Sequence, residues 1–266
     1  MGRVTIFAKG NSDVRDSLHS LRTGGKLLWN GINEIVRARF PGTLVRLRHE
    51  TCTGSEALAA ANGTVPAEVA ARSLPLAPFP AMAQFSSALF TTEVDAIVLS
   101  IQPDLAVPVV RHRREGYLLH PCRWKWWPEA DRLWLRSAFV PEDFPQPAVA
   151  MRNLAAVIAR LQRRSAAPIL VYNLSAIVPG EWVHCHQGLG EILSTRIRRF
   201  NLALTELSEQ TGISIVDVDA IVARAGADRL KLDYWHLTAE GCRLVAEEVV
   251  RILEDWGCLP APELAR

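Results

Sequence analysis

The stretch Val4-Thr5-Ile6-Phe7-Ala8-Lys9-Gly10-Asn11-Ser12 joins an apolar run to a Gly-x-Ser turn near the start of the chain. The run over residues 4–8 is typical of a strand buried in a parallel sheet. A serine directly after such a strand stands at its carboxyl end, where open α/β sheets hold their ligands. The stretch therefore predicts the first strand of an α/β fold and a candidate nucleophile, Ser12.

Four further apolar runs repeat this pattern, and segments of helical period separate them. We expect five strands, at residues 4–8, 43–48, 95–101, 168–173 and 213–218. Helical periodicity covers residues 27–36, 154–161 and 197–207, the last ending at Gly212. A final helix begins at Thr238, a good capping residue, and buries Leu244, Val245, Val249 and Ile252. This alternation predicts an α/β layered fold.

The composition is that of an ordinary globular protein. A chain of 266 residues with 49% hydrophobic content is long enough for one sizeable core, so we expect a single domain over residues 1–266. A net charge of +2 gives no reason to expect nucleic acid or an anionic membrane as a partner. No apolar segment approaches the ~18 residues of a membrane span, and the N-terminus lacks the apolar region of a signal peptide. We therefore expect a cytoplasmic protein.

Cysteine and histidine spacing gives no sign of a disulfide framework or a metal site. The five cysteines are odd in number, widely spaced and without a Cys-x-x-Cys pair, so reduced thiols are expected. His184-Cys185-His186 lacks a third ligand nearby and falls short of a zinc pattern. Because this loop follows the fourth strand, we expect His184 and His186 to contact substrate at the edge that carries Ser12. Neither a metal nor another cofactor is expected.

A serine becomes a nucleophile only when a base removes its proton and a third group orients that base. Asp233-Tyr234-Trp235-His236, just before the final helix, places an acid three positions before an imidazole. In a loop this spacing lets the carboxylate reach the ring nitrogen opposite the one aimed at the serine. Taken singly, Ser12 is a typical helix-capping residue, and Asp233 a surface acid beside a half-buried histidine. Their combination favours a Ser-His-Asp triad.

These residues resemble the sequence blocks of the SGNH, or GDSL-type, superfamily of esterases and lipases. Gly10-Asn11-Ser12 matches the Gly-Asp-Ser of the first block, with Asn11 in place of aspartate. The last block, Asp-x-x-His-x-(Thr/Ser)-x-x-Gly, is matched by Asp233, His236, Thr238 and Gly241. The resemblance spans nearly the whole chain. It implies a three-layer α/β/α domain whose five-stranded parallel sheet has a flavodoxin-like strand order.

The resemblance also implies an oxyanion hole made by the backbone N–H groups of Ser12 and Gly54 and by an asparagine after the third strand. The third block of this chain diverges, because it places Pro103 at the asparagine position, and proline has no N–H donor. We expect the side-chain amide of Gln102, one residue away, to take its place. The alternative is that Gln102 is an ordinary residue at a strand end. Losing one such donor costs roughly 3–4 kcal/mol of transition-state stabilisation.

Residues 103–147 break the alternation and form an insertion that carries four of the eight tryptophans, Trp124, Trp126, Trp127 and Trp134. The insertion is also basic, and its charges suit either a solvated, partly salt-bridged surface or a mouth for an anionic substrate. In the second interpretation Arg111, Arg113 and Trp124, together with Asn11 beside the nucleophile, are candidate substrate-binding residues. The tryptophans equally suit a core or an oligomer contact.

The sequence therefore predicts a serine hydrolase that acts on an ester or thioester through an acyl-enzyme intermediate on Ser12. We expect its substrate to be a small acyl compound or an acyl group on a carrier protein. One alternative is an acyltransferase that uses the same triad. The other is a catalytically silent binding protein with the SGNH fold, which Pro103 and Asn11 would suit.

Overall fold

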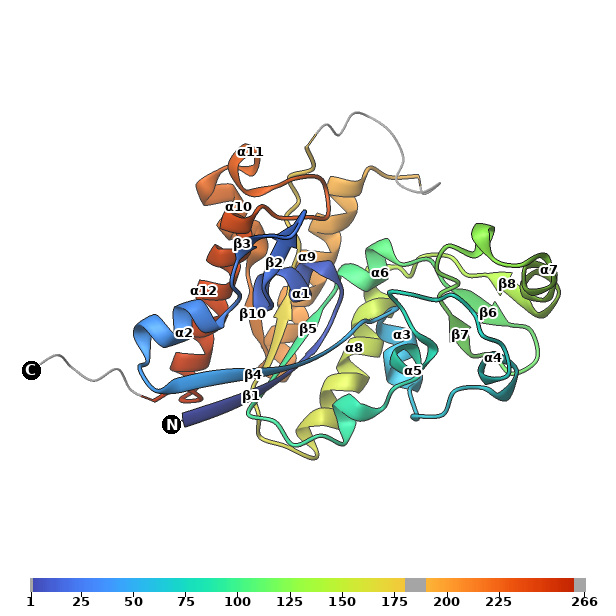
Figure 1. Cartoon of the computed structure of the whole chain (residues 1–266), viewed down its shortest axis with the longest axis horizontal. Coiled ribbons are helices and arrows are strands. Elements are labelled where there is room, and N and C mark those ends of the chain that lie inside the picture. The colour runs from blue at the N-terminus through green and yellow to red at the C-terminus, as the bar shows by residue number, and fades with distance from the viewer. Residues whose placement is uncertain (1, 180–189, 261–266) are drawn as a thin grey trace, which may run out of the picture.

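Five parallel strands form the central sheet of the computed structural model, which describes residues 2–179 and 190–260 (Figure 1). The strands are β1 (Gly2–Lys9), β4 (Thr43–Glu50), β5 (Ala96–Ser100), β9 (Ile169–Tyr172) and β10 (Ser214–Val216). Their order across the sheet is β10-β9-β5-β1-β4, and every neighbouring pair is parallel. All five predicted strands and the flavodoxin-like order are confirmed.

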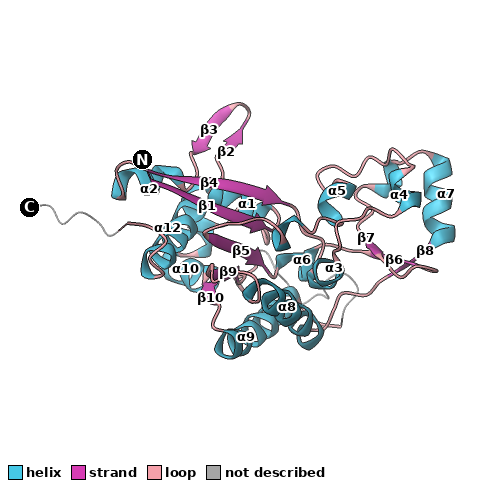
Figure 2. Ribbon diagram, turned by 90° about the horizontal axis from the view of Figure 1, so that it is seen from below, coloured by secondary structure: helices cyan, strands magenta, loops and turns pink. Residues whose placement is uncertain are grey.

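Helices cover both faces of this sheet (Figure 2). Alternate residues of β5 show why both faces need covering: Ala96 and Val98 pack into one apolar cluster, and Ile97 and Leu99 pack into the other. The first face is covered by α1 (Ser12–Leu18), α2 (Asn33–Arg39), α10 (Val218–Ala225) and α12 (Ala239–Asp255). The second is covered by α3 (Ser55–Ala60), α8 (Pro147–Gln162) and α9 (Leu193–Thr211). The fold is a three-layer α/β/α arrangement.

Capping residues mark where α9 ends and where α10 and α12 begin. Thr238 precedes α12, and its hydroxyl oxygen accepts the backbone N–H of Gly241 at 3.2 Å, as the sequence predicts. Gly212 ends α9 in the left-handed conformation, with φ of 71°. Asp217 caps α10 by accepting the backbone N–H of Ala220 at 3.0 Å. Asp217 and Thr238 thereby hold the loops at the carboxyl edge of the sheet, whereas Gly212 lies at the opposite edge, before β10.

One predicted helix is shorter than expected. Leu27 and Leu28 do not belong to a helix; they lie in β3 (Lys26–Trp29), which pairs antiparallel with β2 (Leu21–Thr23). The turn between these strands is the pair Gly24-Gly25, with φ of 56° and 80°. Two adjacent positive φ values favour a tight β-hairpin, and glycine adopts them without steric cost. The helical period of residues 27–36 was misleading here, and α2 begins only at Asn33.

Residues from 110–139, within the expected insertion, and residues from 65–85, outside it, form a side layer with its own apolar cluster. A three-stranded sheet of order β7-β6-β8 contains β6 (Val110–His112), β7 (Leu118–Leu119) and β8 (Phe139–Pro141). The helices and short turns around it are α4 (Ala67–Ala70), α5 (Ala81–Gln84), η2 (Trp124–Trp126) and α7 (Glu129–Ala138). Trp127 is buried in this cluster, whereas Trp126 is 86% exposed. The side layer lies on the side toward which β1 and β4 run (Figure 2).

The remaining elements are η1 (Ala88–Phe90), α6 (Gln102–Ala106) and α11 (Ala227–Leu230). Among the described residues, no helix combines the length and the apolarity needed to cross a bilayer. The four cysteines of this part of the chain, Cys52, Cys122, Cys242 and Cys258, carry free thiols.

Candidate active site

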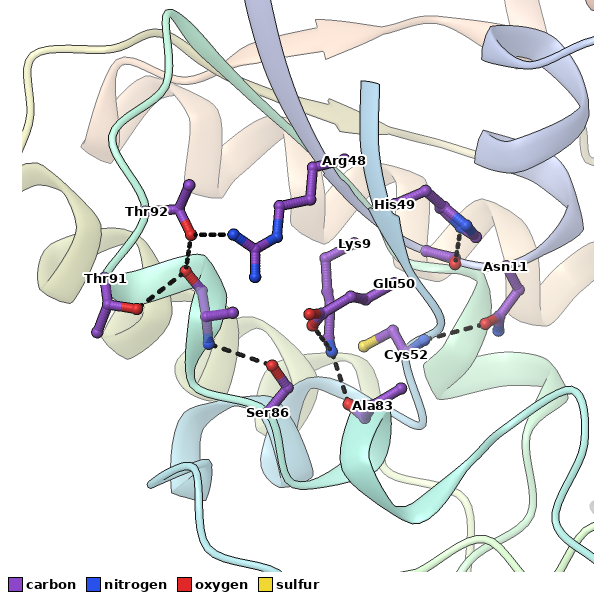
Figure 3. Close-up of polar contacts among 12 residues, drawn as sticks. Lys9, Asn11, Arg48, His49, Glu50, Cys52, Ala83, Ser86, Thr91 and Thr92 are labelled. Carbon is purple, nitrogen blue, oxygen red and sulfur yellow. Dashed lines mark hydrogen bonds and ion pairs between the residues drawn. The ribbon is translucent and has the colours of Figure 1, made fainter. Parts of the chain in front are cut away.

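The turn that carries Ser12 is tied to the neighbouring strand. The backbone N–H of Gly10 donates to Glu50 O at 3.1 Å, and the ring Nε2 of His49 lies 2.9 Å from Gly10 O. The side-chain Oδ1 of Asn11 accepts the backbone N–H of Cys52 at 3.1 Å (Figure 3). A Cβ atom on Gly10 would lie only 2.6 Å from the Val14 side chain, so the turn has no room for a larger residue. These contacts hold Ser12 at the first position of α1.

The last residue of β1, Lys9, is a buried cation directly before this turn. The side chain of Lys9 is 3% exposed, and its Nζ contacts Glu50 Oε2 at 3.0 Å and Ala83 O at 2.8 Å (Figure 3). Because a buried charge is costly unless it is paired and hydrogen-bonded, Glu50 accounts for the burial of Lys9. The pair therefore links the ends of β1 and β4 to α5.

Asp233 and His236 form a hydrogen-bonded pair in the loop before α12. His236 Nδ1 lies 2.8 Å from Asp233 Oδ2, and the backbone N–H groups of Trp235 and His236 donate to Asp233 Oδ1 at 2.7 and 2.8 Å. Burial alone would raise the pKa of Asp233, but the hydrogen bonds from His236 and these N–H groups hold that pKa below its ordinary value. An ionised Asp233 keeps the proton on Nδ1, so Nε2 is the basic ring nitrogen.

The Ser12 turn and the Asp233–His236 loop meet at one small cavity. Asp13, the neighbour of Ser12, and Tyr234 and Trp235, which lie between Asp233 and His236, all line it. Within the described part of the chain, no hydrogen bond joins Ser12 Oγ to His236 Nε2, and the histidine side chain is 46% exposed. Catalytic hydrogen bonds often form fully only with substrate bound, so this arrangement is compatible with a triad.

Gly54 occupies the position predicted for the second oxyanion donor. Its φ of 144° and ψ of 163° lie in a region that is essentially open only to glycine. A Cβ atom there would come within 3.2 Å of Asp104 Oδ1. The same oxygen accepts the backbone N–H and the hydroxyl of Ser55, both at 2.9 Å. Burial raises the pKa of Asp104 to about 6, although the Ser55 hydrogen bonds act in the opposite direction.

Gln102 is the first residue of α6, and Pro103 follows it in the first turn, where proline is well tolerated. The Gln102 backbone N–H donates to Ser100 Oγ at 2.9 Å, and that hydroxyl hydrogen-bonds to Asp13 Oδ2. Its side chain is 3% exposed, and the amide has no hydrogen-bond partner among the described residues. An amide without such a bond keeps its N–H donors available.

Three turns at the carboxyl edge of the sheet are thus joined to one another. Asn11 links the first turn to the second through Cys52, and Ser55 links the second to the third through Asp104. Asp13 links the third turn back to the first through Ser100. Burial raises the pKa of Asp13, in spite of opposing hydrogen bonds from Ser100 and the backbone. The network fixes the relative positions of the backbone N–H groups of Ser12 and Gly54.

Lys231 is a buried residue whose ammonium group donates a hydrogen bond to the Asp233–His236 loop. It is 8% exposed, and its Nζ donates to Ile177 O at 2.6 Å and to Tyr234 O at 3.4 Å. Burial lowers the pKa of Lys231 to about 8, although the nearby carboxylates of Asp233 and Asp219 act against that shift. The side chain therefore connects this loop to the segment that follows β9.

The candidate substrate-binding residues do not all lie together. The guanidinium of Arg111 is engaged by Glu142 Oε2 at 2.7 Å and Glu56 Oε1 at 2.8 Å. Arg113 and Trp124 line a separate cavity in the side layer. Asn11 lies in the nucleophile turn, and its Nδ2 is buried without a hydrogen-bond partner in the described structure. The predicted contacts of His184 and His186 lie outside the described residues.

Glu68, His112 and Glu115 are the one described group whose carboxylate and imidazole atoms cluster closely enough for a metal. However, His112 Nδ1 accepts the backbone N–H of Glu115 at 3.1 Å, which leaves the neutral ring with its proton on Nε2. That N–H faces Glu68 Oε2 at 3.7 Å. This pattern is that of a histidine placed between two acidic residues, and not that of a metal ligand.

Sequence reasoning missed the residues that join the turns. None of Asp13, Ser55, Ser100, Asp104 and Lys231 was predicted to have a role in the site. One signal was available: Ser100 and Asp104 flank the end of a strand expected to be buried, where polar side chains need partners. Lys231 lies two positions before Asp233, but no sequence pattern indicates that its charge is buried.

The fold is that of the SGNH/GDSL-type hydrolases. A lipase/acylhydrolase from Enterococcus faecalis has a TM-score of 0.52 at 10% sequence identity, with 100% of both chains covered. LAE5, an alpha/beta hydrolase enzyme from the metagenome of Lake Arreo, Spain, has a TM-score of 0.53 at 13% identity, covering 98% of this chain and 99% of the other.

A candidate SGNH hydrolase from Slackia heliotrinireducens has a TM-score of 0.50 at 15% identity, covering 94% of this chain and 98% of the other. No protein-family model matches the sequence, and no curated protein matches it either. At such low identity the likeness establishes the fold, and the chemistry must be argued from the residues themselves.

Proposed function

We propose that this protein is an SGNH-type serine esterase with Ser12, His236 and Asp233 as its triad. The observation that carries the proposal is the 2.8 Å hydrogen bond between His236 Nδ1 and Asp233 Oδ2. It leaves Nε2 as the basic nitrogen on a loop that shares a cavity with the Ser12 turn. An oriented base beside a serine at a helix N-terminus is the arrangement that nucleophilic catalysis requires.

The reaction begins when Ser12 Oγ attacks the ester carbonyl carbon and His236 Nε2 takes the hydroxyl proton. The tetrahedral intermediate collapses, and the imidazolium returns that proton to the departing alcohol. A water molecule then attacks the acyl-enzyme with the same base, releasing the carboxylic acid and restoring Ser12. Asp233 remains ionised throughout and stabilises the imidazolium that forms in each half of the reaction.

Three donors serve the developing oxyanion in this proposal. Two are the backbone N–H groups of Ser12 and Gly54, which the hydrogen-bond network holds in place. The third is the side-chain amide of Gln102, which stands one residue before the proline that replaces the usual asparagine. Support for this role comes from the burial of Gln102 and the absence of any hydrogen bond to its amide within the described structure.

The acyl group that fits beside Gly54 is short. A cavity of about 120 Å³ lies there, bordered by Thr53, Pro103, Asp104 and residues of the insertion. It has room for roughly four water molecules, which suits a short acyl chain better than a long one. We therefore propose acetyl to butyryl esters, or the matching thioesters, as the preferred substrates. Hydrolysis of p-nitrophenyl acetate, butyrate and octanoate should show kcat/KM falling from the short esters to octanoate.

Labelling with a fluorophosphonate probe tests the nucleophile. We expect the native protein to be labelled at neutral pH, Ser12→Ala to lose labelling, and Ser20→Ala, a nearby exposed serine, to keep it. Absence of labelling in folded native protein would reject the esterase. The second candidate, a silent binding protein, is favoured by the lack of a Ser12–His236 hydrogen bond in the described structure, and it predicts this unlabelled outcome.

Acyl transfer is tested by partitioning of the acyl-enzyme. We expect added small alcohols at millimolar concentration to leave the yield of free acid unchanged, because water is the acceptor in the proposed reaction. An ester product that grows with the alcohol concentration at the expense of free acid would instead assign the protein to the acyltransferases.

A further inference from the structure

The side layer contains a cavity of about 480 Å³ that none of the proposed catalytic residues lines. Its walls come from β6, β8, α7 and the loop around η2. The apolar part of the lining is formed by Val109, Val110, Trp124, Leu135, Phe139 and Val140. Small-molecule sites in proteins are concave, mostly apolar and commonly about 300–1,000 Å³ in volume. The cavity therefore has the size and the walls of a small-molecule site.

Positive charge gathers around the cavity. Arg113, Arg123 and Arg136 line it, and in the described part of the chain none of the three has a carboxylate oxygen within 4.0 Å. Glu142 is the one carboxylate among the lining residues, and its Oε2 is already bonded to Arg111 Nε at 2.7 Å. The guanidinium of Arg136 lies over the Trp124 ring, 5.6 Å from its centroid. The cavity thus offers guanidinium groups that the protein itself leaves without carboxylate partners.

The backbone at Arg123 is unusual. Its φ is 51°, and among the described residues no other non-glycine residue has a positive φ. A side chain with a Cβ atom adopts this left-handed conformation at a cost in free energy, which glycine would avoid. Residues held in such conformations cluster at ligand-binding positions. The residue with this unusual backbone conformation therefore lies in the wall of the cavity.

We propose that this cavity binds a small amphipathic anion, an apolar chain or ring that carries one carboxylate or phosphate group. The apolar walls would cover the body of the ligand, while the arginines pair with its charged end. Guanidinium groups match both anions because their N–H donors form paired hydrogen bonds with carboxylate and phosphate oxygens. This ligand is distinct from the short acyl group proposed beside Gly54.

The two cavities are neighbours. Pro108, Val109 and Glu142 border both the small cavity beside Gly54 and the larger one in the side layer. The anion site is argued from its own residues and does not depend on the esterase proposal. Its test therefore measures binding alone, with Ser12→Ala protein used in parallel to show that the nucleophile is not involved.

Isothermal titration calorimetry with three ligands of equal chain length tests the site. Octanoate and octyl phosphate supply the two anions, and octanamide is the neutral control. We expect at least one anion to bind at one site per chain and about tenfold more tightly than octanamide. We expect the variant Arg113→Gln/Arg136→Gln to weaken anion binding by about tenfold, and Arg114→Gln, an exposed neighbour that does not line the cavity, to leave it unchanged.

Arg123→Gly separates ligand binding from folding. Glycine adopts a positive φ without the cost that arginine incurs, so we expect an unchanged or higher Tm. Because the guanidinium is lost, we expect anion binding to be at least threefold weaker. Equal affinities for the anions and octanamide would overturn the proposal. So would equal effects of the cavity and Arg114 variants in proteins whose circular dichroism and Tm match the native protein.

Discussion

Asp233 contacts both the backbone and the ring of His236. Its Oδ1 accepts the backbone N–H of His236 at 2.8 Å, and its Oδ2 lies 2.8 Å from the ring Nδ1 of the same residue. One carboxylate therefore fixes both the backbone position of the histidine and the ring nitrogen that carries the proton. Because this loop lies at the carboxyl edge of the sheet, Nε2 is available to a nucleophile carried by another strand.

Asp233→Asn should remove most of the activity without unfolding the protein. An asparagine oxygen can still accept the backbone N–H groups, but its NH₂ group is a donor and cannot accept the hydrogen bond from Nδ1–H. The ring then favours the wrong tautomer, and we expect kcat to fall by on the order of 10³- to 10⁴-fold. Steady-state kinetics with p-nitrophenyl acetate measures this, with the exposed Asp228→Asn as control. A kcat within tenfold of the native value would show that Asp233 is not the orienting acid.

Gln102→Ala should lower kcat while leaving KM nearly unchanged. The amide is proposed to bind the oxyanion, which exists only after attack, so its loss raises the barrier and not the substrate dissociation constant. Removal of one such donor costs about 10²- to 10³-fold in kcat. Gln84→Ala is a contrasting variant, because that buried amide already bonds to Phe79 O and His120 O and should affect folding. An unchanged kcat in Gln102→Ala would exclude Gln102 from the oxyanion hole.

Gly54→Ala should destabilise the protein more than a glycine replacement at an open position. A Cβ atom at Gly54 meets both an unfavourable φ of 144° and the Asp104 carboxylate at 3.2 Å. We expect a loss of about 1–3 kcal/mol in the free energy of unfolding. Gly116→Ala, at φ of 74° with no atom within 4 Å of the new Cβ, should cost roughly 1 kcal/mol. Urea denaturation compares the two variants, and equal losses would contradict the expected close contact.

Asp104→Asn should make the protein more stable at neutral pH and less sensitive to pH. Burial raises the pKa of Asp104 from 3.8 to about 6, so this carboxyl group stays protonated to a higher pH in the folded state than in the unfolded state. The stability that this proton provides is fully present below pH 3.8 and is lost as the pH rises through 6. An amide is neutral throughout and keeps an oxygen for Ser55.

The expected gain of Asp104→Asn is roughly 3 kcal/mol above pH 7, by the linkage between pKa and stability, and almost none near pH 4. Urea denaturation of both proteins between pH 4 and 8 measures the difference. Asp13 titrates in the same direction in both proteins, so its contribution cancels in this comparison. A difference independent of pH would show that the Asp104 carboxylate is not destabilised by burial.

Lys231→Met should slow the reaction although Lys231 does not contact substrate. The ammonium group holds Tyr234 O and Ile177 O, and through them the loop that carries Asp233 and His236. Methionine fills a similar volume but donates nothing, so the imidazole should lose its fixed position. Small misplacements of a catalytic group cost between about 10- and 100-fold in kcat. The rate of fluorophosphonate labelling reports this, and a rate equal to that of the exposed Lys26→Met would contradict it.

The strands were predictable chiefly because the central ones, β5 and β9, are buried on both faces and read as apolar runs, whereas the edge strand β4 is only partly buried and contains Arg46 and Arg48. The run expected over residues 95–101 is β5 (Ala96–Ser100), and all five of its side chains are buried. The hairpin over residues 21–29 was missed because Leu27 and Leu28 happen to continue the period of α2. The pair Gly24-Gly25 was the signal that distinguishes the two structures, since adjacent glycines favour a hairpin turn.

The acid–base pair was predictable because Asp233 and His236 are three residues apart and meet within one loop. The supporting contacts are between distant residues: Ser55 and Asp104 are 49 positions apart, and Asp13 and Ser100 are 87 apart. Contacts between residues so far apart produce no recurring spacing in the sequence from which they could be predicted. Their buried carboxylates look, in sequence, like the exposed acids that are common in any loop.

By itself, the sequence determined the α/β layers, the five strands and the pairing of an acid with a base, because local periodicity and short spacings encode them. Only the tertiary structure decided how the three turns at the sheet edge are joined, that Arg111 is engaged by Glu56 and Glu142, and that Arg113 and Trp124 belong to a separate cavity. The physical reason is that burial, and the partner each charge finds there, depend on which distant segments the fold brings together.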